Sequence, residues 1–199
     1  MTGSDFVRLS KEVREEIGQR HRFAHTLSVA RLARRLARRH DDDPERALVA
    51  GMLHDLARLY PPERLLSECE ARGMRIDAFE RRNPTVLHAR LGAELARERY
   101  GVTDERVLSA IRKHTLGSSA MSRLDAIVYL ADTVEPGRTF DERAQLEALA
   151  FADLDAAMLA TLRATIAFLG ASGKPVAPAT AAADEFYAAA VAVKEKTTA

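Results

Sequence analysis

Apolar residues recur three and four positions apart along most of this chain, and no segment shows the strict alternation typical of a half-buried β-strand. Between Arg22 and Arg39 the apolar positions are Phe23, Leu27, Ala30, Leu32, Ala33, Leu36 and Ala37. This spacing predicts helices over residues 22–39, 44–60, 84–100, 104–115, 122–133, 141–150, 153–169 and 180–194, and a short helix with a turn at Gly73 within residues 63–82. The pattern therefore predicts an all-α fold.

Local signals at the ends of these segments support the boundaries. Asp43 and Asn83 each precede a proline, the arrangement of an N-cap followed by a residue suited to the first helical turn. Thr103 and Ser122 can cap the helices that follow them, and Gly101 can end the helix before it. We therefore interpret the acidic run that ends at Asp43 as a helix start and not as a metal site.

The composition is that of a globular protein, with 47% hydrophobic and 30% charged residues. A chain of 199 residues can bury most of its apolar surface in one core. We expect one domain over residues 1–199, a single helical bundle with its core at about 18–170 and a C-terminal tail helix at about 180–194. The lone Cys69 cannot form an internal disulfide, and nothing in residues 1–10 resembles a secretion signal. We expect a cytoplasmic protein with no membrane partner.

The charge is almost balanced, with 30 basic and 29 acidic side chains and a formal net charge of +1. Such a chain has no general attraction for nucleic acid. The arginines between Arg31 and Arg39 form a local basic cluster, which fits either the solvated face of an amphipathic helix or a nucleic-acid patch. No aromatic residues interleave with these arginines, so we favour the solvated face and expect no nucleic-acid partner.

The candidate chemistry lies in five groups of histidine and aspartate residues, each among apolar neighbours on a different predicted helix, with His54 and Asp55 forming one group. These residues are His25, His54, Asp55, His88, His114 and Asp132. Imidazole and carboxylate groups on apolar helix faces need partners, because burying them unpaired is costly. Helices that converge in a bundle can supply a common partner in the form of a metal ion. Nitrogen and oxygen donors without thiolate suit iron, manganese, cobalt or zinc and disfavour calcium.

The two remaining histidines have simpler interpretations. His40 ends its predicted helix beside acidic residues, where the helix dipole and the neighbouring charges favour an imidazole. His21 lies just before the helix that carries His25, either exposed or at the mouth of a site, and we assign it no role.

The ordered set His25, His54-Asp55 and Asp132 resembles the signature of the HD-domain metal-dependent phosphohydrolases, and His88 and His114 fit the further ligands of its two-metal members. A closer resemblance lies in the strings HRFAHT, AGMLHDLAR, LHARLGAELA, IRKHTLGSSAMS and IVYLADTVEPGR, which are similar to those of the YqeK family. The closing GKPVAPATAAA also resembles that family, so the similarity covers nearly the whole chain. HD alone is a nonspecific motif, whereas the five strings in order are highly specific.

This resemblance implies an HD domain that hydrolyses diadenosine tetraphosphate symmetrically to two ADP. It implies that His25, His54, Asp55 and Asp132 hold one metal ion, and that Asp55, His88 and His114 hold a second. The implied metal is iron, and the implied assembly is a homodimer. A hydroxide bridging two metal ions would attack a phosphoryl group, with His54 and Asp55 at the catalytic centre.

A polyphosphate substrate needs cations around the metal site. On the predicted helices Arg58 lies four residues after His54 and Arg22 lies three residues before His25, so each shares a face with its histidine. The resemblance places phosphate or nucleotide contacts at Arg22, at Arg58, Leu59 and Tyr60, and at Arg138. The family often has lysine at the position of Arg58. The arginine keeps the positive charge and can donate hydrogen bonds to two oxygen atoms at once.

Two further positions have alternative interpretations. Lys113, next to His114, is either another phosphate contact or part of a solvated face. Tyr60 or Tyr129 could stack on adenine, although tyrosines at helical spacing usually belong to a core.

Other functions remain open from the sequence. Another HD phosphohydrolase, such as a nucleoside 5′-monophosphatase, would need fewer cations than Arg58 and Arg138 supply. A non-catalytic nucleotide-sensing HD module would have lost one or more ligands, and all are present here. A nucleic-acid-binding helical protein rests only on the basic cluster at residues 31–39.

Overall fold

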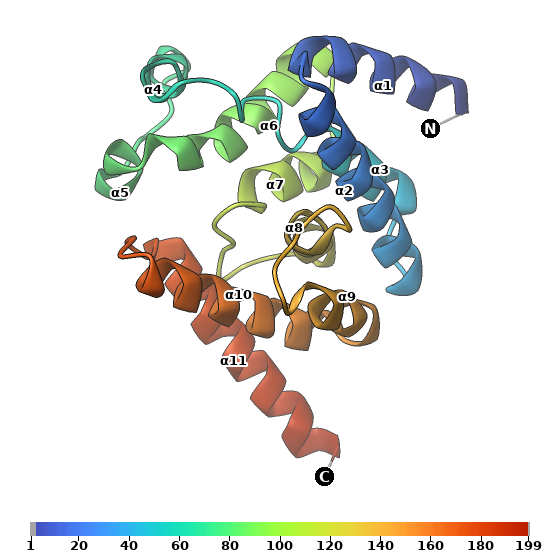
Figure 1. Cartoon of the computed structure of the whole chain (residues 1–199), viewed down its shortest axis with the longest axis vertical. Coiled ribbons are helices and arrows are strands. Elements are labelled where there is room, and N and C mark those ends of the chain that lie inside the picture. The colour runs from blue at the N-terminus through green and yellow to red at the C-terminus, as the bar shows by residue number, and fades with distance from the viewer. Residues whose placement is uncertain (1–2, 199) are drawn as a thin grey trace.

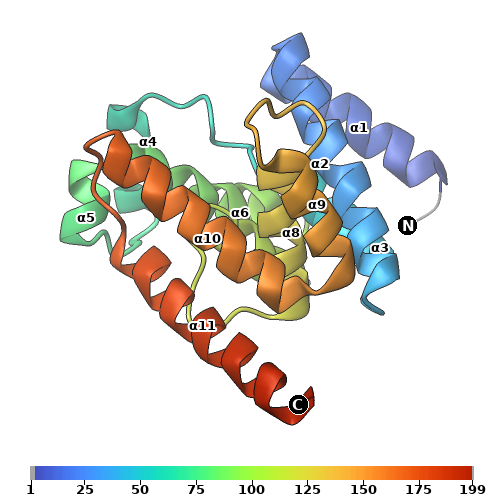
Figure 2. The same ribbon diagram turned by 60° about the horizontal axis from the view of Figure 1, so that its bottom comes forward.

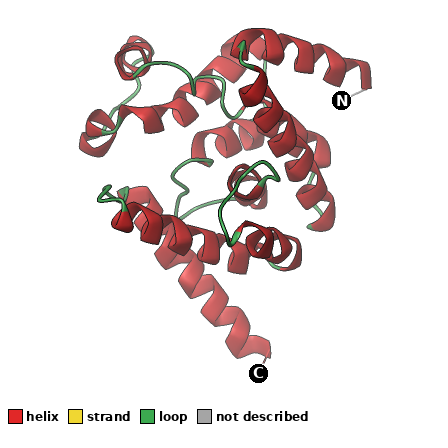
Figure 3. Cartoon of the chain, in the orientation of Figure 1, coloured by secondary structure: helices red, strands yellow, loops and turns green. Residues whose placement is uncertain are grey.

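The computed structural model describes residues 3–198 and contains helices but no strands within that range (Figures 1 and 3). The helices are α1 (Gly3–Ile17), α2 (Arg20–Arg39), α3 (Pro44–Leu53), α4 (Pro62–Ala71), α5 (Ala78–Arg82), the 3-10 helix η1 (Pro84–Val86), α6 (Leu87–Tyr100), α7 (Glu105–Lys113), α8 (Arg123–Val134), α9 (Arg143–Ala152), α10 (Leu154–Ala171) and α11 (Pro178–Thr198). The predicted all-α fold is confirmed.

Helix α8 lies at the centre of the bundle, in contact with α2, α3, α7, α9 and α10 (Figure 1). Every residue from Leu124 to Ala131 is buried, so the apolar run Ala126–Ala131 belongs to the core. Helices α2 and α3 form the most extensive helix pair and close one side of the core. The core is therefore built around the helix that carries Asp132.

The local end signals largely behave as predicted. Asp43 caps α3 by accepting hydrogen bonds from the backbone of Glu45 and Arg46, and Ser122 forms a reciprocal capping box with Asp125. Gly101 ends α6 in the left-handed conformation, at φ 65°.

Two predicted caps are wrong. Asp104, not Thr103, caps α7, because its carboxylate accepts from the backbone N–H of Arg106. Asn83 makes no side-chain cap, and the segment after it is the short helix η1, so α6 begins only at Leu87.

The helix predicted over residues 44–60 is too long, because α3 ends at Leu53. Residues 54–60 continue as tight turns, with Arg58 N–H donating to Asp55 O and Tyr60 N–H donating to Ala57 O. His54 and Arg58 therefore lie beyond the end of α3 and do not share a helix face, contrary to the prediction. Instead His54 and Asp55 lie where the chain leaves the helix, which turns their side chains into the bundle.

Helix α1 was not predicted. Its apolar residues Phe6, Leu9, Val13 and Ile17 are spaced by three and four, and Val13 is fully buried. The same periodicity that identified the other helices was present in this segment.

The last two helices form a hairpin in which α11 turns back across α10 and then leads away from the body (Figures 1 and 2). Its first turn is anchored by the Thr180 hydroxyl, which donates to Leu116 O, and Tyr187 is buried further along. Of the described helices, α10 alone has the length and mean hydropathy, 1.4, that a membrane span needs. In the structure, 22% of this window is buried.

Candidate metal centre

Six side chains from five separate segments converge at one point of the bundle. His25 comes from α2, His54 and Asp55 from the end of α3, His88 from the first turn of α6, His114 from the end of α7 and Asp132 from α8. Groups of three of these residues place their donor atoms within 4.8 Å of one another. The sequence prediction that these residues share one site agrees with this geometry, although His54, Asp55 and His114 follow helix ends and are not inside helices.

Asp55 stands between two pairs of histidines. Its Oδ2 lies 3.5 Å from His54 Nε2 and 3.8 Å from His25 Nε2, whereas its Oδ1 lies 3.4 Å from His88 Nε2 and 3.8 Å from His114 Nε2. The two carboxylate oxygens thus face different sets of nitrogen donors. This is the arrangement that a carboxylate bridging two metal ions requires.

Asp132 completes the first set. Its Oδ1 lies 3.1 Å from His25 Nε2 and 3.8 Å from His54 Nε2. On the opposite side, His88 Nε2 and His114 Nε2 approach each other to 3.2 Å. The Thr115 hydroxyl lies 3.1 Å from His88 Nε2 and 3.0 Å from His114 Nε2, so it can donate a hydrogen bond to either nitrogen.

The backbone fixes three of the four imidazole rings in the same way. The Nδ1 atoms of His54, His88 and His114 each face the carbonyl oxygen three residues earlier, on Gly51, Thr85 and Ile111, at 2.8, 2.5 and 2.8 Å. A carbonyl can only accept, so Nδ1 carries the proton. The lone pair of Nε2 is then directed into the cluster, as metal ligation requires.

The fourth imidazole, on His25, is held by a carboxylate. Its Nδ1 donates to Glu135 Oε1 at 3.1 Å, and Glu135 is 3% exposed. Burial by itself raises the pKa of Glu135, but hydrogen bonds from the Gly137 backbone, Ser28 and His25 lower it below its ordinary value. The sequence analysis missed Glu135, although an acid three residues after Asp132 was a visible signal.

The buried donors fit a bound metal ion. The Nε2 atoms of His25 and His54 are buried and have no hydrogen-bond partner among the described residues. Burial opposes charge on His54, yet the neighbouring Asp55 and Asp132 raise its pKa to about 9. A metal ion would take the place of that proton.

The other ionisable ligands also favour metal binding. Burial, with the charges of His54 and His88, lowers the pKa of His114 to about 3, which keeps its imidazole neutral. Burial would raise the pKa of both carboxyl groups, but the adjacent imidazoles hold the pKa of Asp55 and of Asp132 well below the usual range. Ionised carboxylates and a neutral imidazole are the forms that bind transition metals.

A cavity of about 220 Å³ meets the cluster at Asp55. Its lining includes Arg22, Arg58, Leu59, Tyr60 and Arg64. The Arg22 guanidinium lies 3.8 Å from Asp55 Oδ2, and the Arg64 guanidinium covers the Tyr60 ring at 3.6 Å from its centroid. The structure therefore brings four predicted contact residues, Arg22 and residues 58–60, to one side of the cluster.

A larger cavity of about 510 Å³ meets the cluster at Asp132. Arg138 lies at its edge, donating to Asp132 Oδ1 at 2.7 Å and to Asp132 O at 3.1 Å. The rest of the lining comes from Thr133 of α8, the loop after α8, α9 and one face of α10. Nothing in the sequence analysis pointed to α10.

The structure does not bring Lys113 into either cavity. Its ammonium donates to Asp125 Oδ2 at 2.9 Å and to Ala120 O at 2.7 Å, which ties the end of α7 to the start of α8. Tyr129 is 2% exposed and belongs to the core, where burial raises the pKa of its phenol to about 12. His40 Nε2 lies 2.7 Å from Ala150 O, and His21 is exposed.

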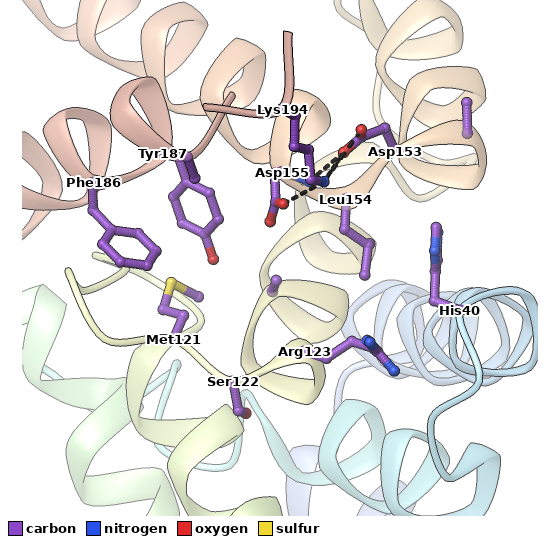
Figure 4. A pocket seen from close by; sticks show the side chains of 13 residues that line it. His40, Met121, Ser122, Arg123, Asp153, Leu154, Asp155, Phe186, Tyr187 and Lys194 are labelled. Carbon is purple, nitrogen blue, oxygen red and sulfur yellow. Dashed lines mark hydrogen bonds and ion pairs between the residues drawn. The ribbon is translucent and has the colours of Figure 1, made fainter. Parts of the chain in front are cut away.

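A third cavity, of about 430 Å³, shares no lining residue with the metal cluster (Figure 4). It lies where α11 passes the start of α8, and Tyr187 points into it (Figure 4). Lys194 pairs there with Asp153 and Asp155, at 3.1 and 2.5 Å, and joins α11 to the start of α10.

The chain was compared with known proteins. Residues 22–137 match the HD domain family. The symmetrical bis(5′-nucleosyl)-tetraphosphatase of Bacillus subtilis (strain 168) is 36% identical over 160 residues, which cover 80% of this chain and 86% of that protein. The enzyme of the same name from Staphylococcus aureus is 30% identical over 164 residues, covering 81% and 82%.

A solved structure shows the same architecture. The crystal structure of a predicted HD superfamily hydrolase involved in NAD metabolism, from Clostridium acetobutylicum, superposes with a TM-score of 0.88 at 34% identity, covering 92% of this chain and 97% of that one. The matched region contains all six clustered histidines and aspartates. The chain therefore belongs to the HD domain family and, within it, to the YqeK group that includes the symmetrical bis(5′-nucleosyl)-tetraphosphatases.

Proposed function

We infer that this protein is a metal-dependent phosphohydrolase that cleaves diadenosine tetraphosphate symmetrically into two ADP. The observation that carries this inference is Asp55, whose two oxygens face separate histidine pairs inside a buried six-ligand cluster. The relatives named symmetrical bis(5′-nucleosyl)-tetraphosphatase align along most of the chain and support the same activity.

The donor set supports two metal ions. His25, His54, Asp55 and Asp132 would hold one ion, and Asp55, His88 and His114 would hold the other. We propose iron, while manganese, cobalt and zinc are compatible with the same nitrogen and oxygen donors. When bound, such ions activate water and neutralise charge that develops on a phosphoryl group. His54 and Asp55 are the central residues of this proposal because Asp55 faces both donor sets and His54 lies next to it in the first set.

The surrounding arginines would position the phosphate chain. Arg22 and Arg138 contact the two ligand carboxylates, on Asp55 and Asp132, and they line different cavities. A tetraphosphate that spans the cluster would meet one guanidinium on each side, with Arg58 on the Asp55 side. Lys113 is engaged with Asp125, so we leave it out of the phosphate site.

Symmetrical cleavage breaks the bond between the second phosphorus and the oxygen that joins it to the third. Water supplies the oxygen that forms the new bond to phosphorus, and a proton leaves to solvent. The leaving group is ADP, which departs through an oxygen of its terminal phosphate and needs little protonation. This explains why the site can work without a dedicated general acid.

The alternatives are less well supported. A nucleoside monophosphate carries one phosphate group and has no use for guanidinium groups in two separate cavities. A non-catalytic sensor does not require all six ligands, yet the described residues supply them. The protein is further proposed to be cytoplasmic and homodimeric, with a small dinucleoside polyphosphate as its partner and no nucleic acid or membrane.

Product analysis tests the function directly. The metal-loaded protein is incubated with diadenosine tetraphosphate and the nucleotides are separated by ion-exchange chromatography. We expect ADP as the sole nucleotide product, at two per substrate consumed. Formation of ATP and AMP, or turnover of AMP but not of the dinucleotide, would contradict the proposal.

A further inference from the structure

A threonine hydroxyl lies beside the two histidines of the second donor set. Thr115 follows His114 directly, in the turn after α7, and is half-buried. Its Oγ1 lies 3.1 Å from His88 Nε2 and 3.0 Å from His114 Nε2, and the two nitrogens are 3.2 Å apart. The three atoms therefore form a nearly equilateral triangle.

These three atoms have too few protons to satisfy one another. The Nδ1 atoms of His88 and His114 each donate to a backbone carbonyl, so each Nε2 presents a lone pair to the triangle. The Thr115 hydroxyl has one proton and can donate it to only one of the nitrogens at a time. Asp55 Oδ1 is a further acceptor, 3.4 Å from His88 Nε2 and 3.8 Å from His114 Nε2. A cation would satisfy all four electron-pair donors at once, which a single proton does not.

The spacing of the triangle also fits donors that share one ion. Transition-metal ions lie about 2.1 Å from nitrogen and oxygen ligands, which puts neighbouring ligands about 3.0 Å apart at a right angle and about 3.4 Å apart at a tetrahedral angle. The observed edges of 3.0, 3.1 and 3.2 Å fall in this range. A hydrogen bond cannot account for the edge between the two nitrogens, because neither nitrogen carries a proton.

The hydroxyl would give both metal ions the same number of protein ligands. In the proposed function the first ion has four such ligands, whereas the second has three, from Asp55, His88 and His114. We propose that the Thr115 hydroxyl oxygen is a fourth protein ligand of the second metal ion, an inference that rests on the two-ion site of the proposed function. A hydroxyl carries no charge, so it completes the ligand set without reducing the positive charge that faces a polyphosphate.

The test measures metal binding and not turnover, with zinc as the probe because it has no redox chemistry. Metal-free full-length protein is titrated with zinc in competition with a chromophoric chelator, which gives the number of ions bound per chain and the affinity for each. Thr115→Val and Thr115→Ala lack the hydroxyl but differ in size, and Thr115→Ser keeps it. Thr103→Val is the matched control, because Thr103 is an exposed threonine just before α7 and outside the cluster.

We expect wild type to bind two zinc ions, and the two variants without the hydroxyl to bind one of these ions about tenfold more weakly, as for other groups that support a metal site. Thr115→Ser should retain most of the wild-type affinity, and Thr103→Val should bind zinc like wild type. Agreement between Thr115→Val and Thr115→Ala would assign the loss to the hydroxyl and not to packing, and thermal melts of the metal-free proteins verify folding.

A double-mutant cycle assigns the weakened ion to a donor set. His88→Ala removes a ligand of the second set, so adding Thr115→Val to it should cause no further loss of affinity for the ion that remains. His25→Ala removes a ligand of the first set, and adding Thr115→Val to it should still weaken zinc binding. A loss that persists in the His88→Ala background would overturn the proposal.

The opposite result is expected if the hydroxyl only hydrogen-bonds to the imidazoles of the metal-free protein. Metal binding would then break that hydrogen bond, so Thr115→Val would bind zinc as tightly as wild type or more tightly. This outcome, or an equal loss in Thr115→Ser and Thr115→Val, would overturn the proposal while leaving the two-ion site intact. Wild type that binds fewer than two ions would overturn both. Failure of the proposed hydrolysis is detected separately, in the product analysis, and a loss of zinc affinity confined to the variants without the hydroxyl would still support Thr115 as a ligand.

Discussion

At the scale of single residues, the cluster depends on how each imidazole is oriented. Three rings are held by carbonyl groups three residues earlier, which need no side chain beyond the histidine itself. His25 lacks such an acceptor and relies on Glu135, 110 residues away in sequence. Glu135 also accepts from the Gly137 backbone, and the Glu135 carbonyl accepts from Arg138 N–H. One residue therefore holds both the His25 ring and the turn that carries Arg138.

This dual contact makes Glu135 a positioning residue with a measurable effect on metal binding. We expect Glu135→Ala to lower metal affinity by about 10- to 100-fold, the usual consequence of losing a partner behind a ligand. Glu135→Gln keeps an acceptor for His25 and should lose less. Affinity is measured by competition with a chromophoric chelator, independently of turnover.

Glu185→Ala serves as the control for this series, since Glu185 is an exposed acid on α11. The positioning role is wrong if Glu135→Ala binds metal as tightly as wild type. It is also wrong if Glu135→Gln loses as much affinity as Glu135→Ala, because Glu135→Gln keeps an acceptor for His25 and Glu135→Ala does not.

At the scale of helices, the position of His54 is set by close packing between α2 and α3. A Cβ added at Gly51 would lie 2.6 Å from Ala30 Cα, so only glycine permits this approach. Gly51 also supplies the carbonyl that orients His54. The contact between the two helices thus brings His54, at the end of α3, next to His25 of α2, with the ring centroids 5.4 Å apart.

Gly51→Ala should therefore lower the free energy of unfolding by about 1–3 kcal/mol, because the collision is with backbone atoms that cannot rotate away. Gly170→Ala is the matched control. Gly170 lies in α10, its added Cβ would meet no atom within 4 Å, and this variant should be neutral or more stable by up to about 1 kcal/mol. Urea unfolding followed by circular dichroism measures both, and equal stabilities would contradict the packing argument.

At the scale of the whole molecule, the cluster joins segments that are otherwise far apart in sequence. Its ligands come from α2, α3, α6, α7 and α8, so bound metal ions would cross-link most of the bundle. A ligand that binds only the folded state stabilises it in proportion to its affinity. The stability of the bundle should consequently depend on metal.

Removal of metal with a chelator should lower the melting temperature by about 5–10 °C, given roughly 2.7 kcal/mol of linkage at metal concentrations of about one hundred times Kd. Readdition of metal should restore it. In Asp55→Ala the melting temperature should not respond to metal, because both ligand sets lose their shared carboxylate. Asp41→Asn, at an exposed position with φ 52°, should respond like wild type. A metal response retained by Asp55→Ala would refute the bridging arrangement.

Much of the fold follows from short-range information in the sequence. Helical periodicity and caps such as Asp43 and Ser122 are local, because a capping carboxylate or hydroxyl acts within its own turn. Those signals predicted most of the helices, and they predicted that the histidines and aspartates lie on helices of one bundle. The convergence of His25, His54, Asp55, His88, His114 and Asp132 was predictable because buried imidazoles and carboxylates need partners.

Other features depend on tertiary packing. Local signals did not predict that α3 ends at Leu53. Nor could they predict contacts between separate segments, such as that of Glu135 with His25 or that of Lys113 with Asp125. The cavity between Arg138 and α10 likewise exists only where distant segments meet. The sequence by itself determined most of the helices and the residue types of the candidate metal site. The tertiary structure alone decided that Glu135 orients His25 and where a substrate could lie, because these features depend on packing between segments remote in the chain.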